Sequence, residues 1–205
     1  MAREELGGRR DLIAEAATTV IARDGLRALT HRAIDREAAL PPGSTSYYAP
    51  TRLSLIELVA RRLADRTAAD LRWFFGELAA RSEQPLTEDL AEVVAAVLGD
   101  LVRRLAARRD DQRARFALMI DMVDREPVRS ILTTGSPTAG DSLEVAAGIL
   151  GRFGIPASPA RVQELVLFTD GLLFTVVTRA GFGAELVDID AALLAQLRGM
   201  QPDGM

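Results

Sequence analysis

Residues 29–52 read LTHRAIDREAALPPGSTSYYAPTR, and this stretch decides how the N-terminal part of the chain folds. Thr30 is a favoured N-cap residue and predicts a short helix that runs to about Ala38. Pro41-Pro42-Gly43 predicts the start of a second short helix, which reaches about Tyr48, because proline is tolerated in a first helical turn. Two short helices joined by a tight turn are the layout of a helix-turn-helix unit.

The segments that flank this stretch complete a three-helix head. Residues 11–24 repeat apolar side chains at helical spacing, and Asp24-Gly25 predicts the end of that helix. The turn between the two short helices falls at Ala39-Leu40, with alanine where glycine is common, and Ala49-Pro50 ends the second short helix. The predicted core of the head consists of Leu12, Ala16, Val20, Leu29, Ala33, Ile34, Ala38 and Leu40.

The rest of the chain is predicted to be a larger helical body. A long helix is expected to begin at Thr51 and to run to about Arg81. Further helices are expected over 87–108, 111–124, 127–133, 141–153, 159–180 and 190–199. No segment shows the alternation typical of strands, so the predicted fold class is all-α, with a helix-turn-helix head and about nine or ten helices in total.

Composition narrows the function classes. The 205 residues include no cysteine and one histidine, His31, so disulfides, thiolate zinc sites and cysteine nucleophiles are excluded, and we expect no metal, cofactor or catalytic residues. The net charge of −4 is uneven: residues 1–66 hold 11 arginines and 9 acidic residues, whereas residues 67–205 hold 14 arginines and 20 acidic residues. No signal peptide or membrane-spanning segment is recognised, which predicts a soluble, cytoplasmic protein.

The second short helix carries the side chains that suggest a function. Its sequence is expected to expose a run of hydroxyl-bearing residues, namely Ser44, Thr45, Ser46, Tyr47 and Tyr48. Such side chains can approach phosphates and read base edges in the major groove of DNA. The alternative is that they only pack. His31 is expected to be a polar surface residue or to lie near a phosphate, rather than to act as a catalyst or ligand.

The head resembles the amino-terminal domain of TetR-type transcriptional repressors. The resemblance is carried by DLIAEAA at 11–17, DGL at 24–26, LTHRAIDREAAL at 29–40 and PGSTSYYAPTR at 42–52, about a quarter of the chain. It implies a helix-turn-helix DNA-binding domain over 1–50 and a ligand-binding and dimerisation domain over 51–205. It further implies a homodimer that binds a near-palindromic double-stranded DNA operator as a repressor and is released by a small apolar or amphipathic effector.

The resemblance also implies the residues that contact DNA. They lie at the start of the first short helix, along the recognition helix and at the head of the long helix: Thr30, Arg32, Ser44, Thr45, Ser46, Tyr47, Tyr48 and Arg52. The sequence departs from the family at Ala49, where a large aromatic residue is usual, and at Thr45 and Ser46, where an aliphatic residue and a tyrosine are frequent. We therefore expect one of the two tyrosines to turn inward and fill the space of the missing ring.

Two sets of residues in the body are candidates for the other functions. The dimer seam is placed by the resemblance on the helices over 141–153 and 159–180, with Leu143, Val145, Ala146, Ile149, Leu150, Val162, Leu165, Val166, Thr169 and Leu173 as candidates. Aromatic and other large apolar side chains that could line an effector site are Trp73, Phe75, Phe116, Met119, Phe168 and Leu172. Both sets could instead be ordinary core, and Arg113 and Arg115 are interpreted as part of a solvated face.

Two other function classes stay open at this point. An enzyme is disfavoured because the chain lacks a phosphate-cradling glycine loop, and the glycines at 148, 151 and 154 do not have the spacing of a dinucleotide motif. A helical small-molecule-binding or interaction protein without DNA binding is conceivable because of the departures at Ala39 and Ala49.

Overall fold

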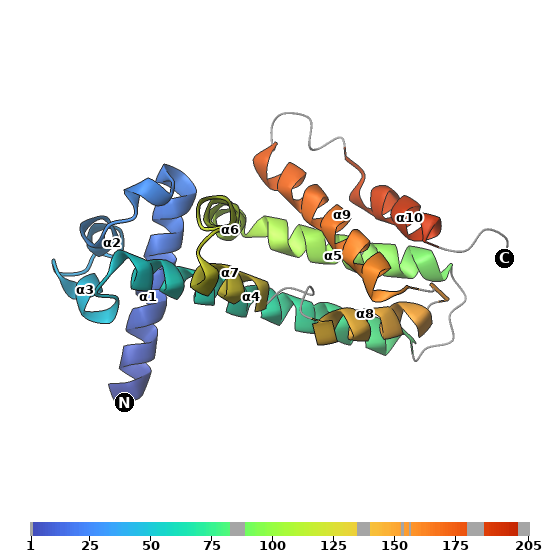
Figure 1. The fold of residues 1–205 in the computed structure, drawn as a ribbon, viewed down its shortest axis with the longest axis horizontal. Helices are drawn as coiled ribbons and strands as arrows, with labels where there is room; N and C mark the ends of the chain where they lie inside the picture. The colour runs from blue at the N-terminus through green and yellow to red at the C-terminus, as the bar shows by residue number, and fades with distance from the viewer. Residues whose placement is uncertain are drawn as a thin grey trace. The chain divides into compact units, whose positions relative to one another are not determined.

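A computed structural model describes residues 2–82, 89–134, 140–152, 154–155, 157–179 and 187–200, and within these residues the chain is helical without strands (Figure 1). The elements are α1 (Ala2–Asp24), a 3₁₀ turn η1 (Leu26–Ala28), α2 (His31–Glu37), α3 (Ser44–Tyr48), α4 (Arg52–Ser82), α5 (Leu90–Ala107), α6 (Arg109–Asp121), α7 (Glu126–Thr134), α8 (Gly140–Arg152), α9 (Pro159–Thr178) and α10 (Ile189–Gly199). The all-α prediction is confirmed. The predicted helix start at Thr87 lies outside the described residues.

Packing groups the chain into two compact units. The first comprises Met1–Arg66 and Arg108–Gly135, and the second comprises Thr67–Ala107 and Ser136–Met205. Helix α4 contributes residues to both units, and α6 and α7 pack with the N-terminal helices rather than with α5. This division differs from the predicted domain boundary between residues 50 and 51. The assignment of functions to 1–50 and 51–205 stays a prediction.

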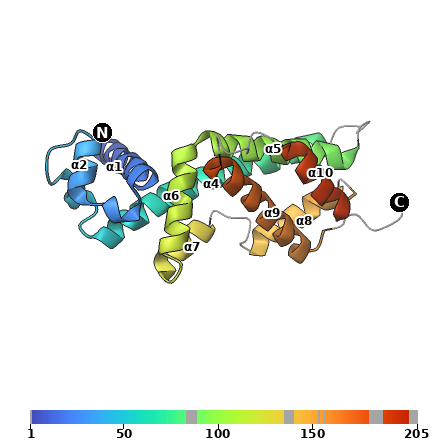
Figure 2. The same ribbon diagram turned by 90° about the horizontal axis from the view of Figure 1, so that it is seen from above.

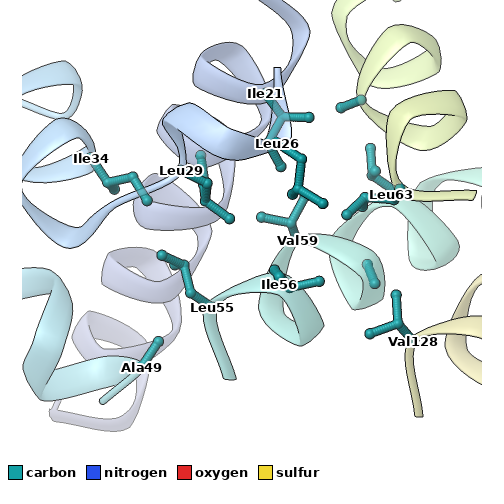
Figure 3. Close-up of a cluster of buried hydrophobic side chains, with 14 of the residues drawn as sticks. Ile21, Leu26, Leu29, Ile34, Ala49, Leu55, Ile56, Val59, Leu63 and Val128 are labelled. Carbon is teal, nitrogen blue, oxygen red and sulfur yellow. The ribbon is translucent and has the colours of Figure 1, made fainter. Parts of the chain in front are cut away.

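The core of the first unit joins the N-terminal helices to α4, α6 and α7 (Figure 3). Its labelled side chains are Ile21, Leu26, Leu29, Ile34, Ala49, Leu55, Ile56, Val59, Leu63 and Val128. The predicted core residues Ala16, Val20, Leu29 and Ile34 are buried, whereas Ala33, Ala38 and Leu40 are half-buried. Leu12 is 40% exposed, so its place in the predicted core is wrong; its neighbour Ile13 is fully buried because the apolar stripe of α1 is centred there.

Side-chain and backbone caps set the limits of the helices around α2. The Thr30 hydroxyl accepts a hydrogen bond from the N–H of Ala33 at 3.2 Å, so the predicted N-cap of α2 is confirmed. Thr51 caps α4 reciprocally with Ser54, because each hydroxyl accepts from the other's backbone N–H at 3.0 Å. Gly25 ends α1 with φ 82° and ψ 167°, a conformation that side chains exclude.

The turn between α2 and α3 is a Schellman motif. The N–H of Leu40 donates to the carbonyl of Asp35 at 2.8 Å, and the N–H of Ala39 donates to the carbonyl of Arg36 at 3.3 Å. Ala39 occupies the left-handed position of the motif with φ 52°. Glycine is usual there because a Cβ atom makes this conformation unfavourable. The turn therefore forms with a strained residue at its centre.

The second unit is built around α5. Helices α9 and α10 pack against α5, and α8 packs against α9 (Figure 2). Ser158 caps α9, with Pro159 in its first turn as predicted, and Asp188 caps α10. Within the described ranges, no helix combines the length and apolar character that crossing a bilayer requires.

The strain at Ala39 gives a stability prediction. Ala39→Gly is expected to raise the free energy of unfolding by about 0.5–1 kcal/mol, because relief of the left-handed alanine outweighs the extra entropy of glycine in the unfolded chain. Chemical denaturation followed by circular dichroism measures the change. The matched control is Ala33→Gly inside α2, which should lower the free energy of unfolding by about 1 kcal/mol. Destabilisation by both variants would contradict the assignment of strain to Ala39.

Candidate DNA-binding site

The carboxylate of Asp35 holds α3 against α2. Its Oδ1 accepts hydrogen bonds from the backbone N–H of Thr45 at 2.8 Å and from the Thr45 hydroxyl at 2.6 Å. Its Oδ2 accepts from the N–H of Gly43 at 2.7 Å. Helix α3 has only five residues, too few to be stable alone. Its position therefore depends on this buried carboxylate, which the sequence analysis did not single out.

The protonation state of Asp35 follows from these contacts. Burial alone would raise the pKa of the carboxyl. The hydrogen bonds from the Thr45 hydroxyl and from the N–H groups of Thr45 and Gly43 stabilise the ionised form, and the net effect is a pKa below the usual range. Asp35 is thus held as a carboxylate, the form that can accept all three hydrogen bonds.

Thr45 does not belong to the surface of α3. It is fully buried, and its hydroxyl is used in the hydrogen bond to Asp35. The expectation that it is exposed is wrong, because the short helix turns this side chain toward α2. Ser44 is half-buried, and its hydroxyl donates to the carbonyl of Pro41 at 2.7 Å.

The exposed face of α3 consists of Ser46 and Tyr47. Tyr47 is 77% exposed, whereas Tyr48 is half-buried and packs against the core of the first unit. The two rings meet edge to face with centroids 5.1 Å apart. Tyr48 is therefore the tyrosine that turns inward, as expected for one of the pair, and Ala49 beside it is buried.

The first turn of α2 lies beside the end of α3. His31 Nε2 is 2.6 Å from the carbonyl oxygen of Ala49, and since a carbonyl only accepts, Nε2 carries the proton. His31 thus fixes the end of α3 to α2. Thr30 and Arg32 are exposed. The Thr30 hydroxyl accepts from Ala33, which leaves its proton available to donate to another group.

Arg52 is engaged with the protein backbone. Its guanidinium donates to the carbonyl of Leu26 at 2.6 Å and also to the carbonyl of Leu29. These bonds tie the start of α4 to η1 and to the segment that precedes α2. From the sequence, Arg52 was expected to contact a phosphate, and these bonds to the backbone were not predicted.

Three exposed cations of η1 and α2 have no carboxylate partner among the described residues. Among the described residues, Arg27, Arg32 and Arg36 form no ion pair, and all three are exposed. The nearby acidic side chains are engaged elsewhere, because Asp24 and Glu37 both pair with Arg23 at 3.0 Å. Helix α2, which packs against α3, and η1 therefore carry unpaired positive charge although the whole chain is acidic.

The sequence and the fold of this chain both resemble those of known proteins. The sequence model described as the tetracycline repressor-like C-terminal domain matches residues 87–202, more than half of the chain. The chain belongs to the tetracycline repressor-like (TetR) family. A search of curated protein sequences finds no relative of this TetR-family chain.

Several solved structures share the fold of this TetR-family chain. A TetR-family protein from Streptomyces coelicolor A3 superposes with a TM-score of 0.65 at 25% identity over 95% of this chain and 98% of its own. A transcriptional regulator from Rhodococcus sp. Rha1 gives 0.70 at 21% identity over 93% and 95%. The multidrug binding protein EbrR, complexed with imidazole, gives 0.63 at 22% identity over 96% and 97%.

Half of the ten seam residues predicted for this TetR-family chain are core. Ala146, Leu150, Val162, Leu165 and Leu173 are buried inside the second unit. The others are half-buried, namely Leu143, Ile149, Val166 and Thr169, and the side chain of Val145 is outside those described. On α8 and α9 the most apolar stripe faces inward because it packs into the core of the same subunit.

The predicted effector residues fall in both compact units. Phe116 and Met119 lie on α6 in the first unit, and Met119 is exposed. The second unit contains the four others, which are half-buried: Trp73, Phe75, Phe168 and Leu172. The guanidinium of Arg104 lies 5.0 Å from the ring centroid of Trp73 and donates to Asp70 at 2.9 Å.

Helix α6 also holds polar residues that the sequence analysis missed. Arg113 is exposed as expected, but Arg115 is buried, so its assignment to a solvated face is wrong. Gln112 is buried as well. The exposed Arg109 and Arg113 lie close to them in the sequence, so the local composition did not distinguish buried from exposed polar residues. Across the described part of the chain, no group of three or more acidic or histidine side chains is placed to hold a metal ion.

The role of Asp35 gives a second prediction. Asp35→Asn is expected to lower the free energy of unfolding at neutral pH by about 2 kcal/mol, because the amide keeps one acceptor oxygen and leaves at least one buried N–H unpaired. Since the folded pKa of Asp35 lies below its unfolded value, its contribution is present above the unfolded pKa and is lost as the pH falls through the folded pKa. The variant should therefore lose less stability than the wild type on acidification.

Urea denaturation at a series of pH values measures both effects. The matched control is Asp65→Asn, which changes an exposed aspartate on α4 in the same unit. Equal stability losses for the two variants would show that Asp35 does not hold α3 in place.

Proposed function

We propose that the chain is a ligand-responsive transcriptional repressor that binds a near-palindromic DNA operator as a homodimer and is released by a small effector. The observation that carries the proposal is the exposed face of α3 with Ser46 and Tyr47, together with the unpaired cations Arg32 and Arg36 on α2, the helix that packs against α3. Hydroxyl groups and arginines supply the base-edge and phosphate contacts of helix-turn-helix proteins. The family membership supports the same function.

Fewer residues are proposed to contact DNA than the sequence alone predicted. Thr30 and Arg32 at the start of α2 are proposed to donate to phosphates, and Ser46 and Tyr47 to enter the major groove. Ser44, Tyr48 and Arg52 keep smaller roles, because each is partly engaged with the protein itself. Thr45 is proposed to act through Asp35 by fixing the orientation of α3.

A dimer is proposed because one head is too small to select a site. A strongly specific interface buries about 1,000 Å² or more of protein surface, and two heads about 34 Å apart reach successive major grooves. The outward face of α9 offers a seam: Leu167 is 62% exposed, Phe174 is 45% exposed, and Gly171 lies between them. A Cβ added at Gly171 would meet no atom within 4 Å, so a partner helix can approach closely there.

The effector is proposed to act through α4, which has residues in both compact units. A ligand changes DNA affinity only if it binds one conformation more tightly than the other. Phe116 and Met119 of α6 are proposed to contact it, and Trp73, Phe75, Phe168 and Leu172 stay predicted ligand residues. Complexes of EbrR with imidazole, malachite green and ethidium support small-molecule binding in this fold.

The DNA-binding proposal predicts separable effects of two variants. Arg32→Ala should weaken binding to all DNA sequences and reduce the slope of log affinity against log salt by about 1, because one phosphate contact is lost. Tyr47→Ala should cost about 1–3 kcal/mol on the operator and much less on unrelated DNA. Fluorescence anisotropy with labelled DNA from upstream of the chain's own gene measures both.

The control for these titrations is Arg61→Ala on α4, an exposed arginine that pairs with Glu57 at 3.6 Å in the same unit. It should leave operator affinity unchanged. Failure of the wild-type protein to bind this DNA, or wild-type affinity in both variants, would instead favour a helical small-molecule-binding or interaction protein.

The dimer proposal predicts a change of oligomeric state. Leu167→Glu should convert the protein to a monomer, because a charge on the seam cannot be desolvated, and should lower operator affinity at least about 100-fold through loss of the second head. Light scattering coupled to size-exclusion chromatography measures the mass. Val123→Glu, at another exposed apolar position, should stay dimeric. A dimeric Leu167→Glu variant would place the seam elsewhere.

A further inference from the structure

Helix α6 carries two buried polar side chains with unused hydrogen-bonding capacity. Gln112 is 2% exposed, and its Oε1 atom has no hydrogen-bond partner. Arg115 is 7% exposed, and among the described residues its guanidinium has neither a hydrogen bond nor an ion pair. An arginine stays charged at any physiological pH, and the guanidinium nitrogens of Arg115 are not among the fully buried atoms that lack a partner. Oε1 of Gln112 therefore lacks a buried partner, and the guanidinium of Arg115 is free to bind an anion.

The neighbouring carboxylate does not supply that partner. Asp111 is buried one turn before Arg115, but it accepts two hydrogen bonds from Arg66, at 2.8 and 2.9 Å, and also pairs with Arg108 at 3.2 Å. Arg66 in turn contacts Glu15 of α1. Asp111 thus faces two cations already, and Arg115 is left out of this network. The other acidic residues of α6, Asp110 and Asp121, are exposed.

Gln112 and Arg115 share a helix face with apolar side chains. Residues 112, 115, 116 and 119 follow the i, i+3, i+4, i+7 spacing that places side chains on one side of a helix. Phe116 and Met119 are the two residues of α6 proposed above to contact the effector. One face of α6 therefore combines a hydrogen-bond acceptor, a cation and two large apolar groups, the mixture that a site for an amphipathic anion requires.

We infer that the effector is a small amphipathic organic acid. Its carboxylate accepts charge-assisted hydrogen bonds from Arg115, a hydrogen-bond donor on the same molecule meets Oε1 of Gln112, and its apolar body packs against Phe116 and Met119. This inference rests on the proposed function only in calling the ligand an effector. The buried, unpartnered state of the two side chains is independent of whether the protein binds DNA.

Matched ligand series test the inference on the full-length protein. Octanoate, phenylbutanoate and naphthoate are each titrated by calorimetry beside the corresponding amide and amine. At least one carboxylate should bind about 10- to 100-fold more tightly than its amide and amine, the range expected for a charge-assisted hydrogen bond in a buried site. Gln112→Leu should weaken binding of acids that carry a second hydrogen-bond donor, with hydroxyl-substituted naphthoate as the probe.

The decisive variant is Arg115→Met, with Arg113→Met on the exposed side of the same helix as its control. Arg115→Met should abolish the preference for carboxylates while remaining folded without ligand, because Arg115 forms no hydrogen bond or ion pair within the described chain that the variant would lose. Arg113→Met should keep the preference. Absence of any carboxylate preference, its persistence in Arg115→Met, or unfolding of that variant, which would reveal a structural partner, each overturns the inference.

Operator binding measured without ligand keeps the two proposals apart. If the protein binds its operator but prefers no carboxylate, the inference fails and the repressor function stands. If carboxylates bind through Arg115 but no operator is bound, the inference stands for the ligand and the repressor function fails.

Discussion

The carboxylate of Asp35 is the contact on which the geometry of the head depends. A helix of five residues does not form in isolation, so α3 takes its order from tertiary contacts. Asp35 supplies three hydrogen-bond acceptor interactions at the start of α3, and His31 holds its end through the carbonyl of Ala49. The exposed face of α3 is therefore oriented by these two side chains of α2.

The local signals in the sequence predicted most of the fold. Thr30, Thr51 and Ser158 cap helices where the sequence places them, because a cap is decided by a few neighbouring residues. The tertiary role of Asp35 could not be predicted in the same way. Its partners lie eight and ten residues away, and their hydrogen bonds depend on a turn whose left-handed alanine is not a usual choice.

The candidate sites were harder to predict than the helices. Periodicity identifies an apolar stripe but not whether the stripe meets its own subunit or another chain, and Leu165 and Leu173 are core while Leu167 and Phe174 are exposed. Likewise, a short polar helix does not reveal which hydroxyl points inward, so Thr45 and Ser46 were grouped together. The burial of Arg115 could not be predicted because its neighbours in the sequence are charged, and only the packing of α6 distinguishes a buried arginine from a solvated one.

The left-handed Ala39 has an evolutionary consequence. Alanine and glycine codons differ by one base, so a more relaxed turn is a single mutational step away. Natural proteins commonly lie just above the stability they need, and gains of this size can offset a harmful change elsewhere. A lineage that changes the exposed face of α3 at some cost in stability could therefore recover that cost at position 39, in the turn, without changing α3 itself.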